Sequence, residues 1–147
     1  MTQNPDSGCI VEMARECLGF RLRKLDRVVS GYYNEALKPL GIKISQMNIL
    51  VIIAIMKQAS PSDICNYARI NISTLSRNIE RMEAKGWVKY LPAEDGRSHY
   101  LSVTANGMKL LNSVYAAWKK AQQQVQSLLG KEMSRHLDLL STKIMSA

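Results

Sequence analysis

The feature that most constrains the fold of this sequence is an amphipathic helix in its central third. Apolar residues recur there at spacings of three, four and three, which is the period of one helix face. They are Ile72, Leu75, Ile79 and Met82. Asn71 precedes them as a helix N-cap, and Gly86 follows them as a stop signal. The sequence therefore predicts a helix between these two residues, with the apolar stripe facing a core.

The opposite face of the same helix is polar. It carries Ser73, Thr74, Ser76, Arg77, Asn78 and Arg81. Short hydroxyl and amide groups let a helix approach base edges closely, and a guanidinium group can reach guanine or phosphate. This composition is typical of a helix that enters the major groove of DNA. A solvated polar face is the alternative that the helix alone leaves open.

The segments on both sides favour the DNA-binding interpretation. Upstream, residues 60–63 (Ser-Pro-Ser-Asp) combine a cap, a proline at the first helical position and an acidic first turn. Only a few residues separate that helix from the next, which is helix-turn-helix spacing. Downstream, residues 87–91 and 99–103 favour β-strands and flank a turn-forming loop at 92–98. A hairpin in this place is a wing, so the sequence predicts a winged helix-turn-helix.

The loop of this wing carries an arginine near its tip. Arg97 can enter a narrow minor groove, where the negative potential of DNA is strongest. Asp95, two residues earlier, either pairs with Arg97 and holds its direction or serves only as a turn residue. We include both residues in the expected DNA-binding surface.

With these segments in place, the chain resembles the MarR (multiple antibiotic resistance regulator) family of bacterial transcription factors. The matching segments are 72–77 (ISTLSR), 82–88 (MEAKGWV), 94–97 (EDGR) and 101–104 (LSVT), with Gly107 after them. Length and helix order extend the resemblance over nearly the whole chain. It implies a dimeric transcriptional regulator, most often a repressor, that binds double-stranded DNA at a palindromic operator.

Three segments make up the predicted organisation. Residues 1–42 and 105–147 form a helical dimerisation region around a winged helix-turn-helix at 43–104, so the fold class is mainly α with a small β-hairpin wing. The expected helices outside the DNA-binding unit span about 10–37, 104–129 and 131–145. Lone amphipathic helices of this length need a partner surface. A two-fold homodimer provides one and matches a two-fold operator; a helical bundle within a monomer is the alternative.

Composition adds less than the motifs do. The 147 residues contain 20 Lys and Arg against 12 Asp and Glu, a net charge of +8, which favours polyanionic partners. Basic residues outnumber acidic ones by six to five in 1–42, eight to five in 43–104 and six to two in 105–147. Because the predicted DNA-binding segment is only mildly basic, the prediction of DNA binding rests on the order of the motifs and not on charge.

Other classes of protein are disfavoured. No apolar run reaches the roughly 18–20 residues of a membrane span, and the N-terminus has no signal sequence, so we expect a cytoplasmic protein. Three cysteines without a CxxC motif indicate neither a disulfide framework nor a metal site. The two histidines, His99 and His136, lie in different segments, and no paired carboxylates or phosphate-binding loop accompany them. We therefore expect no catalytic activity and no cofactor.

The resemblance also implies control by a small molecule. The expected pocket lies between the helical dimer and the DNA-binding unit, with Arg21, Arg23, Met47 and Trp118 as candidate lining residues and an anionic aromatic compound as ligand. Some relatives instead sense oxidants through a cysteine in the first helix. Cys17 is the candidate here, although the matching position is Gly19, and cysteine in an apolar helix is most often a small hydrophobe. An alternative of another class is an adaptor whose winged helix binds a protein instead of DNA.

Overall fold

The computed structural model of the chain describes residues 7–93 and 98–145. The elements in chain order are α1 (Ser7–Glu16), α2 (Leu18–Leu37), the 3₁₀ helix η1 (Lys38–Leu40), α3 (Ile44–Met56), α4 (Pro61–Ala68), α5 (Ile72–Ala84), β1 (Val88–Pro92), β2 (His99–Val103) and α6 (Ala105–Met145). The two strands form one antiparallel hairpin. The predicted fold class, mainly α with a small hairpin wing, is confirmed.

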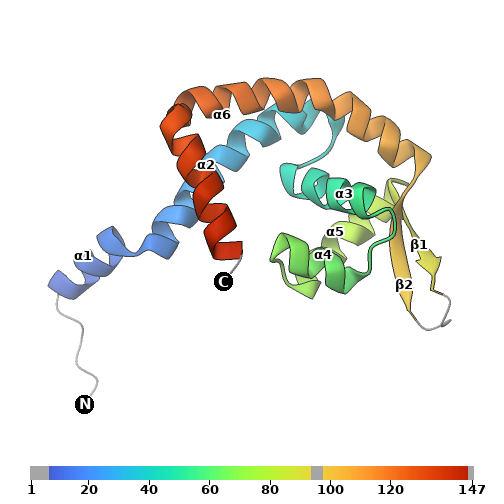
Figure 1. Cartoon of the computed structure of the whole chain (residues 1–147), viewed down its shortest axis with the longest axis horizontal. Coiled ribbons are helices and arrows are strands. Elements are labelled where there is room, and N and C mark those ends of the chain that lie inside the picture. Colours follow the sequence, from blue (N-terminus) through green and yellow to red (C-terminus); the bar gives the residue numbers. More distant parts are fainter. Residues whose placement is uncertain (1–6, 94–97, 146–147) are drawn as a thin grey trace, which may run out of the picture.

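Helix α6 spans the molecule, and the other elements are arranged along it. Figure 1 shows α6 running over α2, with α3, α4, α5 and the hairpin gathered near its N-terminal part. Helix α1 lies at the far end, away from the hairpin. On α2, the Tyr33 hydroxyl donates a hydrogen bond to Oε1 of Gln122 on α6, and burial raises the pKa of Tyr33.

One hydrophobic core lies beneath α6, in the part of the chain that we call the central lobe (residues 43–104). Its largest fully buried side chains are Leu37, Leu50, Ile53, Ile64, Leu75, Ile79, Met82 and Leu101. The end of α2 and the start of α6 close this core, through Leu37 and Val114. Helix α3 is apolar on nearly all sides because it packs against α2, α4, β2 and α6.

Local start signals place several helices where the sequence predicts them. Asn71 caps α5, its Oδ1 accepting a hydrogen bond from the Thr74 N–H at 2.8 Å. Ser60 caps α4 by accepting from the Asp63 N–H at 3.1 Å, and the Asp63 carboxylate accepts from the Ser60 hydroxyl at 2.6 Å. This hydrogen bond from Ser60 holds the pKa of Asp63 below its usual value. Thr104 likewise caps α6 by accepting from the Gly107 N–H at 3.1 Å.

The break predicted inside the C-terminal helical region is also present. Gly130 has φ +78° and ψ +161°, which divides α6 into two helical parts, before and after this residue. A positive φ of this kind is accessible to glycine at little cost. The two parts of α6 are therefore set at an angle to each other, and Figure 1 shows this bend.

Two boundaries differ from the prediction. The continuous N-terminal helix expected over 10–37 is divided at Cys17, whose ψ of 103° is non-helical. No residue of α1 is buried, so no packing holds α1 in line with α2. Helix α3 begins at Ile44 rather than after a Ser45 cap, because the side chain of Gln46 accepts from the Lys43 N–H at 3.1 Å.

Membrane-crossing potential is limited to a bent pair of segments. In the described ranges, no single helix has the length and apolarity to cross a membrane. The segments Leu18–Leu40 and Ile44–Met56 meet the length and composition criteria only when taken together, and they are bent by 79° relative to each other.

Candidate nucleic-acid interface

The helix-turn-helix consists of α4 and α5, and burial fixes the rotation of α5. Leu75, Ile79 and Met82 are buried, so the opposite side of α5 faces outward. The turn before α5 contains Arg69 in the left-handed conformation (φ +52°), where its N–H donates to the carbonyl of Cys65. Because both helices are fixed at this turn, the N-terminal end of α5 keeps a defined position on the surface.

The six candidate residues on α5 fall into two groups. Ser73, Ser76, Arg77 and Arg81 are exposed, whereas Thr74 and Asn78 are half-buried. The Asn78 amide donates to the carbonyl of Thr74 at 2.9 Å. The polar stripe on α5 is therefore narrower than the sequence pattern suggests, and its most accessible groups are two serines and two arginines.

At the N-terminal end of α5, polar groups bond to each other. The Ser73 hydroxyl donates to Asn71 Oδ1 at 2.9 Å, and Arg77 Nε donates to the carbonyl of Ser73 at 3.3 Å. Ile72, assigned by its spacing to the core stripe, is 58% exposed. The sequence-based assignment of Ile72 to the core is wrong, because the first residue of α5 lies before the point where the helix contacts the core.

The wing is tied to the rest of the central lobe. Val88 pairs with Val103 and Pro92 with His99. The loop between α3 and α4 adds a short bridge to β2. The Ala59 N–H donates to the carbonyl of Leu101 at 3.1 Å, and the Leu101 N–H donates to the carbonyl of Ala59 at 2.8 Å. Asp95 and Arg97, the two candidate residues of the wing, lie outside the described residues.

The outer side of the wing carries an aromatic pair. The rings of Tyr90 and His99 meet edge to face, with centroids 6.3 Å apart. Burial is the main cause that raises the pKa of Tyr90, and the negative charges of Glu83 and Glu80 add to it. Glu80 and Glu83 belong to α5, which packs against the first strand of the wing.

Both connections between the central lobe and the flanking helices meet at the turn after α5. From the N-terminal side, the carbonyl of Gly41 accepts a hydrogen bond from Lys85 Nζ at 2.7 Å. From the C-terminal side, the Thr104 hydroxyl donates to the carbonyl of Gly86 at 2.5 Å, and the Thr104 N–H donates to the carbonyl of Trp87 at 2.9 Å. Sequence reasoning missed this meeting point, because the Gly41–Lys85 contact joins residues 44 positions apart.

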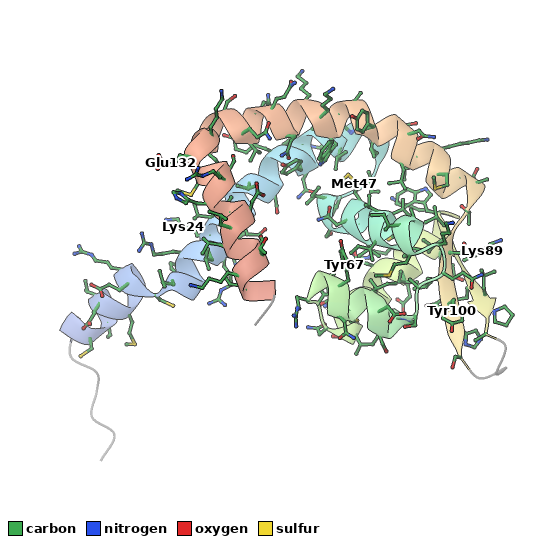
Figure 2. The ribbon with its side chains drawn as sticks, in the orientation of Figure 1. Lys24, Met47, Tyr67, Lys89, Tyr100 and Glu132 are labelled. Carbon is green, nitrogen blue, oxygen red and sulfur yellow. The ribbon has the colours of Figure 1, made fainter. Side chains whose placement is uncertain are left out.

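A cavity of about 520 Å³ lies between α3 and α6. Its lining residues are Met47, Asn48, Val51, Ala54, Ile55, Leu111, Val114, Tyr115 and Trp118. The structure thus brings together Met47, labelled on α3 in Figure 2, and Trp118, two of the four candidate ligand-binding residues. Arg21 and Arg23 are exposed on α2 and do not line this cavity.

The cysteines lie apart from this cavity. Cys17, the candidate redox residue, is exposed at the break between α1 and α2, Cys9 is exposed on α1, and Cys65 is half-buried on α4. Within 7–93 and 98–145, no group of three His, Cys, Asp or Glu side chains is arranged to hold a metal ion.

Comparison with known proteins agrees with this geometry. Residues 40–98 match the model of the MarR family. The transcriptional regulator PecS of Dickeya dadantii is 34% identical over 86 residues, which are 58% of this chain and 52% of PecS. The multiple antibiotic resistance protein MarR of Escherichia coli is 26% identical over 116 residues, which are 78% of this chain and 70% of MarR. The chain thus spans about half the length of PecS.

Solved structures share the fold. A mutant MarR from E. coli complexed with operator DNA has a TM-score of 0.80 at 21% identity, covering 90% of this chain and 96% of that one. CouR from Rhodococcus jostii, bound to p-coumaroyl-CoA, has a TM-score of 0.73 at 18% identity, covering 87% and 91%. The winged helix-turn-helix of this order is shared with the relatives that are named transcriptional regulators. Residues 40–98 match the MarR family, and the chain as a whole has the fold of the solved MarR structures.

Proposed function

We propose that this chain is a homodimeric, sequence-specific DNA-binding regulator that acts in the cytoplasm as a transcriptional repressor. The observation that carries the proposal is the exposed polar face of α5, fixed beside a hairpin wing. Exposed serines and arginines on that face offer donors and acceptors to base edges and phosphates. The similarity of fold to an E. coli MarR complexed with operator DNA supports the same role for this surface.

We assign the DNA contacts to two elements. The exposed residues of α5 contact the major groove; they are Ser73, Ser76, Arg77 and Arg81. The half-buried Thr74 and Asn78 support this surface through the hydrogen bond from the Asn78 amide to the Thr74 carbonyl. Asp95 and Arg97 of the wing contact the adjacent minor groove or the backbone.

The terminal helices supply the dimer interface in this proposal. By terminal helices we mean α1, α2 and the last part of α6 (residues 131–145). Their exposed large apolar side chains include Ile10, Val11, Met13, Leu18, Phe20, Leu22, Leu25, Met133, Leu137, Leu139, Leu140 and Ile144. So many exposed apolar groups on neighbouring helices mark a surface that a second chain covers. A two-fold dimer matches a palindromic operator, because each recognition helix then meets one half-site.

The cavity between α3 and α6 is the proposed effector site. Its walls are mainly aliphatic and aromatic, and Trp118 and Tyr115 are stacked with centroids 6.1 Å apart. An aromatic ligand fits such walls. The anionic class expected from the resemblance needs a cation as well. None lines this cavity among the described residues, and Arg21 and Arg23, the candidates from the sequence, lie on α2 outside it. The alternative is redox control, in which peroxide releases the wild type from DNA but leaves a Cys17→Ser variant bound.

A titration of DNA binding tests the proposed function. Preferred sequences are selected from random DNA, and affinity is measured by fluorescence anisotropy at several salt concentrations. We expect the logarithm of affinity to fall linearly with the logarithm of salt concentration. Arg77→Ala should lose about 1–3 kcal/mol on a site where Arg77 reads a base and should relax the preference at that base.

The control is Lys109→Ala, which removes one exposed positive charge from the start of α6 rather than from α5. This variant should bind like the wild type. Selection that returns no preferred sequence, together with binding that does not depend on salt, would favour the adaptor alternative.

A further inference from the structure

The first residue of α5 is an apolar side chain on a surface that is otherwise polar. Ile72 is 58% exposed, whereas the three apolar residues that follow it at helical spacing are all buried. Helical geometry places Ile72 directly before Ser73 and one turn before Ser76. Its side chain therefore lies at the N-terminal edge of the surface assigned to DNA.

Neither helix formation nor the core accounts for an isoleucine at this position. A β-branched residue is a weaker helix former than most unbranched ones, and the cap of α5 is provided by Asn71. Single exposed apolar residues are common on protein surfaces. The other exposed large apolar residues of the central lobe, within the described ranges, are Ile55, Tyr67 and Tyr90. Ile55 lines the cavity, Tyr90 meets His99 and Tyr67 belongs to α4, so Ile72 alone among them lies on α5.

The polar groups around Ile72 already have partners within the helix. Asn71 Oδ1 accepts from the Ser73 hydroxyl at 2.9 Å and from the Thr74 N–H at 2.8 Å. The carbonyl of Ser73 accepts from Arg77 Nε at 3.3 Å. Ser73 Oγ and the Nη groups of Arg77 keep hydrogen-bonding capacity for DNA, and Ile72 supplies the exposed apolar side chain at this end of α5.

The major groove offers one apolar group to such a side chain. The 5-methyl of thymine is absent from the other three bases, and contact with it distinguishes thymine from cytosine. The N-terminal residues of a recognition helix are those that meet base edges. We propose that Ile72 is a specificity-determining residue that recognises the 5-methyl group of one thymine in each half-site. This inference rests on the proposed function, since it requires α5 to enter the major groove.

Replacing thymidine by deoxyuridine tests the proposal, because this change removes only the methyl group. The wild type is first used to select its preferred DNA. Deoxyuridine then replaces each thymidine of one half-site in turn, and the dissociation constant is measured each time. We expect one position at which the wild type loses about fourfold in affinity, the factor that corresponds to about 0.8 kcal/mol per buried CH₂-sized group.

The variant Ile72→Ala should bind the thymine and uracil forms of that position equally, while its response at every other thymine stays as in the wild type. Ile72→Val keeps the branched methyl groups and should retain most of the discrimination. Met108→Ala, which shortens an exposed apolar side chain at the start of α6, should retain all of it. An unchanged unfolding midpoint for Ile72→Ala is expected from its exposure, and it separates a lost contact from a misfolded helix.

Two results would overturn the inference in distinguishable ways. Sequence-specific binding by the wild type with the same deoxyuridine losses in Ile72→Ala would reject the role of Ile72 and leave the proposed function standing. Failure of the wild type to select any DNA sequence would reject both.

Discussion

In the central lobe most apolar side chains of α3, α4 and α5 point into one core, whereas in the terminal helices many apolar side chains face outward. Leu50, Ile64 and Leu75 are fully buried or nearly so, while Leu22 on α2 and Leu137 on the last part of α6 are more than two-fifths exposed. The chain itself therefore completes the core of the lobe. The terminal helices also have apolar faces, but other parts of the same chain do not cover them. A second chain would cover these faces, which is why we propose that the terminal helices form a dimer interface.

The largest expected effect comes from a charge placed on the outward-facing apolar surface. Leu137→Asp would put a carboxylate among the apolar groups of the proposed dimer interface, where an unpaired charge costs several kcal/mol. We expect this variant to sediment as a monomer at micromolar concentrations at which the wild type is a dimer. Ser113→Asp is the control, because Ser113 is exposed on the first part of α6, outside the terminal helices. A wild type that sediments as a folded monomer would refute the dimer and remove the contrast between the two regions.

The second effect compares one glycine from each region. Gly107 begins α6 against the turn after α5, and a Cβ added there would lie 2.2 Å from the carbonyl oxygen of Trp87. Gly31 lies inside α2, and a Cβ there would meet nothing within 4 Å. Gly107→Ala should lower the free energy of unfolding by about 1–3 kcal/mol or more, since backbone must move. Gly31→Ala should raise it by up to about 1 kcal/mol.

Denaturant unfolding at one fixed protein concentration measures both changes, because the stability of a dimer depends on concentration. Equal effects of the two variants would mean that the junction at Gly107 is not tightly packed in solution. A loss at Gly31 would instead indicate that the second chain approaches α2 closely at that point.

Sequence reasoning succeeded where the signal is local. The caps at Ser60, Asn71 and Thr104 join groups three residues apart, and the break at Gly130 depends on the glycine itself, so the local sequence contains their cause. On the candidate site, the same reasoning placed six polar residues on one side of α5, and four of them are exposed.

It failed where the cause lies in another element. The break at Cys17 reflects the absence of packing on α1, and the exposure of Ile72 reflects where α5 first contacts the core. The cavity contains Met47 and Trp118 but not the two arginines of α2, because their positions depend on how α2, α3 and α6 pack. The spacing of apolar residues predicts which face of a helix is apolar. It does not predict which residues along that face are buried by other elements.

The smallest expected effect concerns the connection between the two regions. Lys85 Nζ donates to the carbonyl of Gly41 at 2.7 Å and lies 4.5 Å from the centroid of the Trp87 ring. These contacts join the end of α5 to the point where the chain enters the central lobe. Exposed contacts of this kind are worth about 0.5–1 kcal/mol each. Lys85→Met keeps most of the side chain but removes the charge, so it should cost about 1 kcal/mol of stability.

Its effect on DNA recognition should be more informative than its effect on stability. If Lys85 holds the lobe at a fixed angle to the terminal helices, Lys85→Met should tolerate a change of one base pair in half-site spacing better than the wild type does. Lys85→Arg keeps a donor and a cation and should restore part of the spacing preference. Lys109→Met, an exposed lysine on α6, provides the control. A Lys85→Met variant with reduced stability but wild-type spacing preference would show that this contact supports the fold without setting the distance between the two recognition helices.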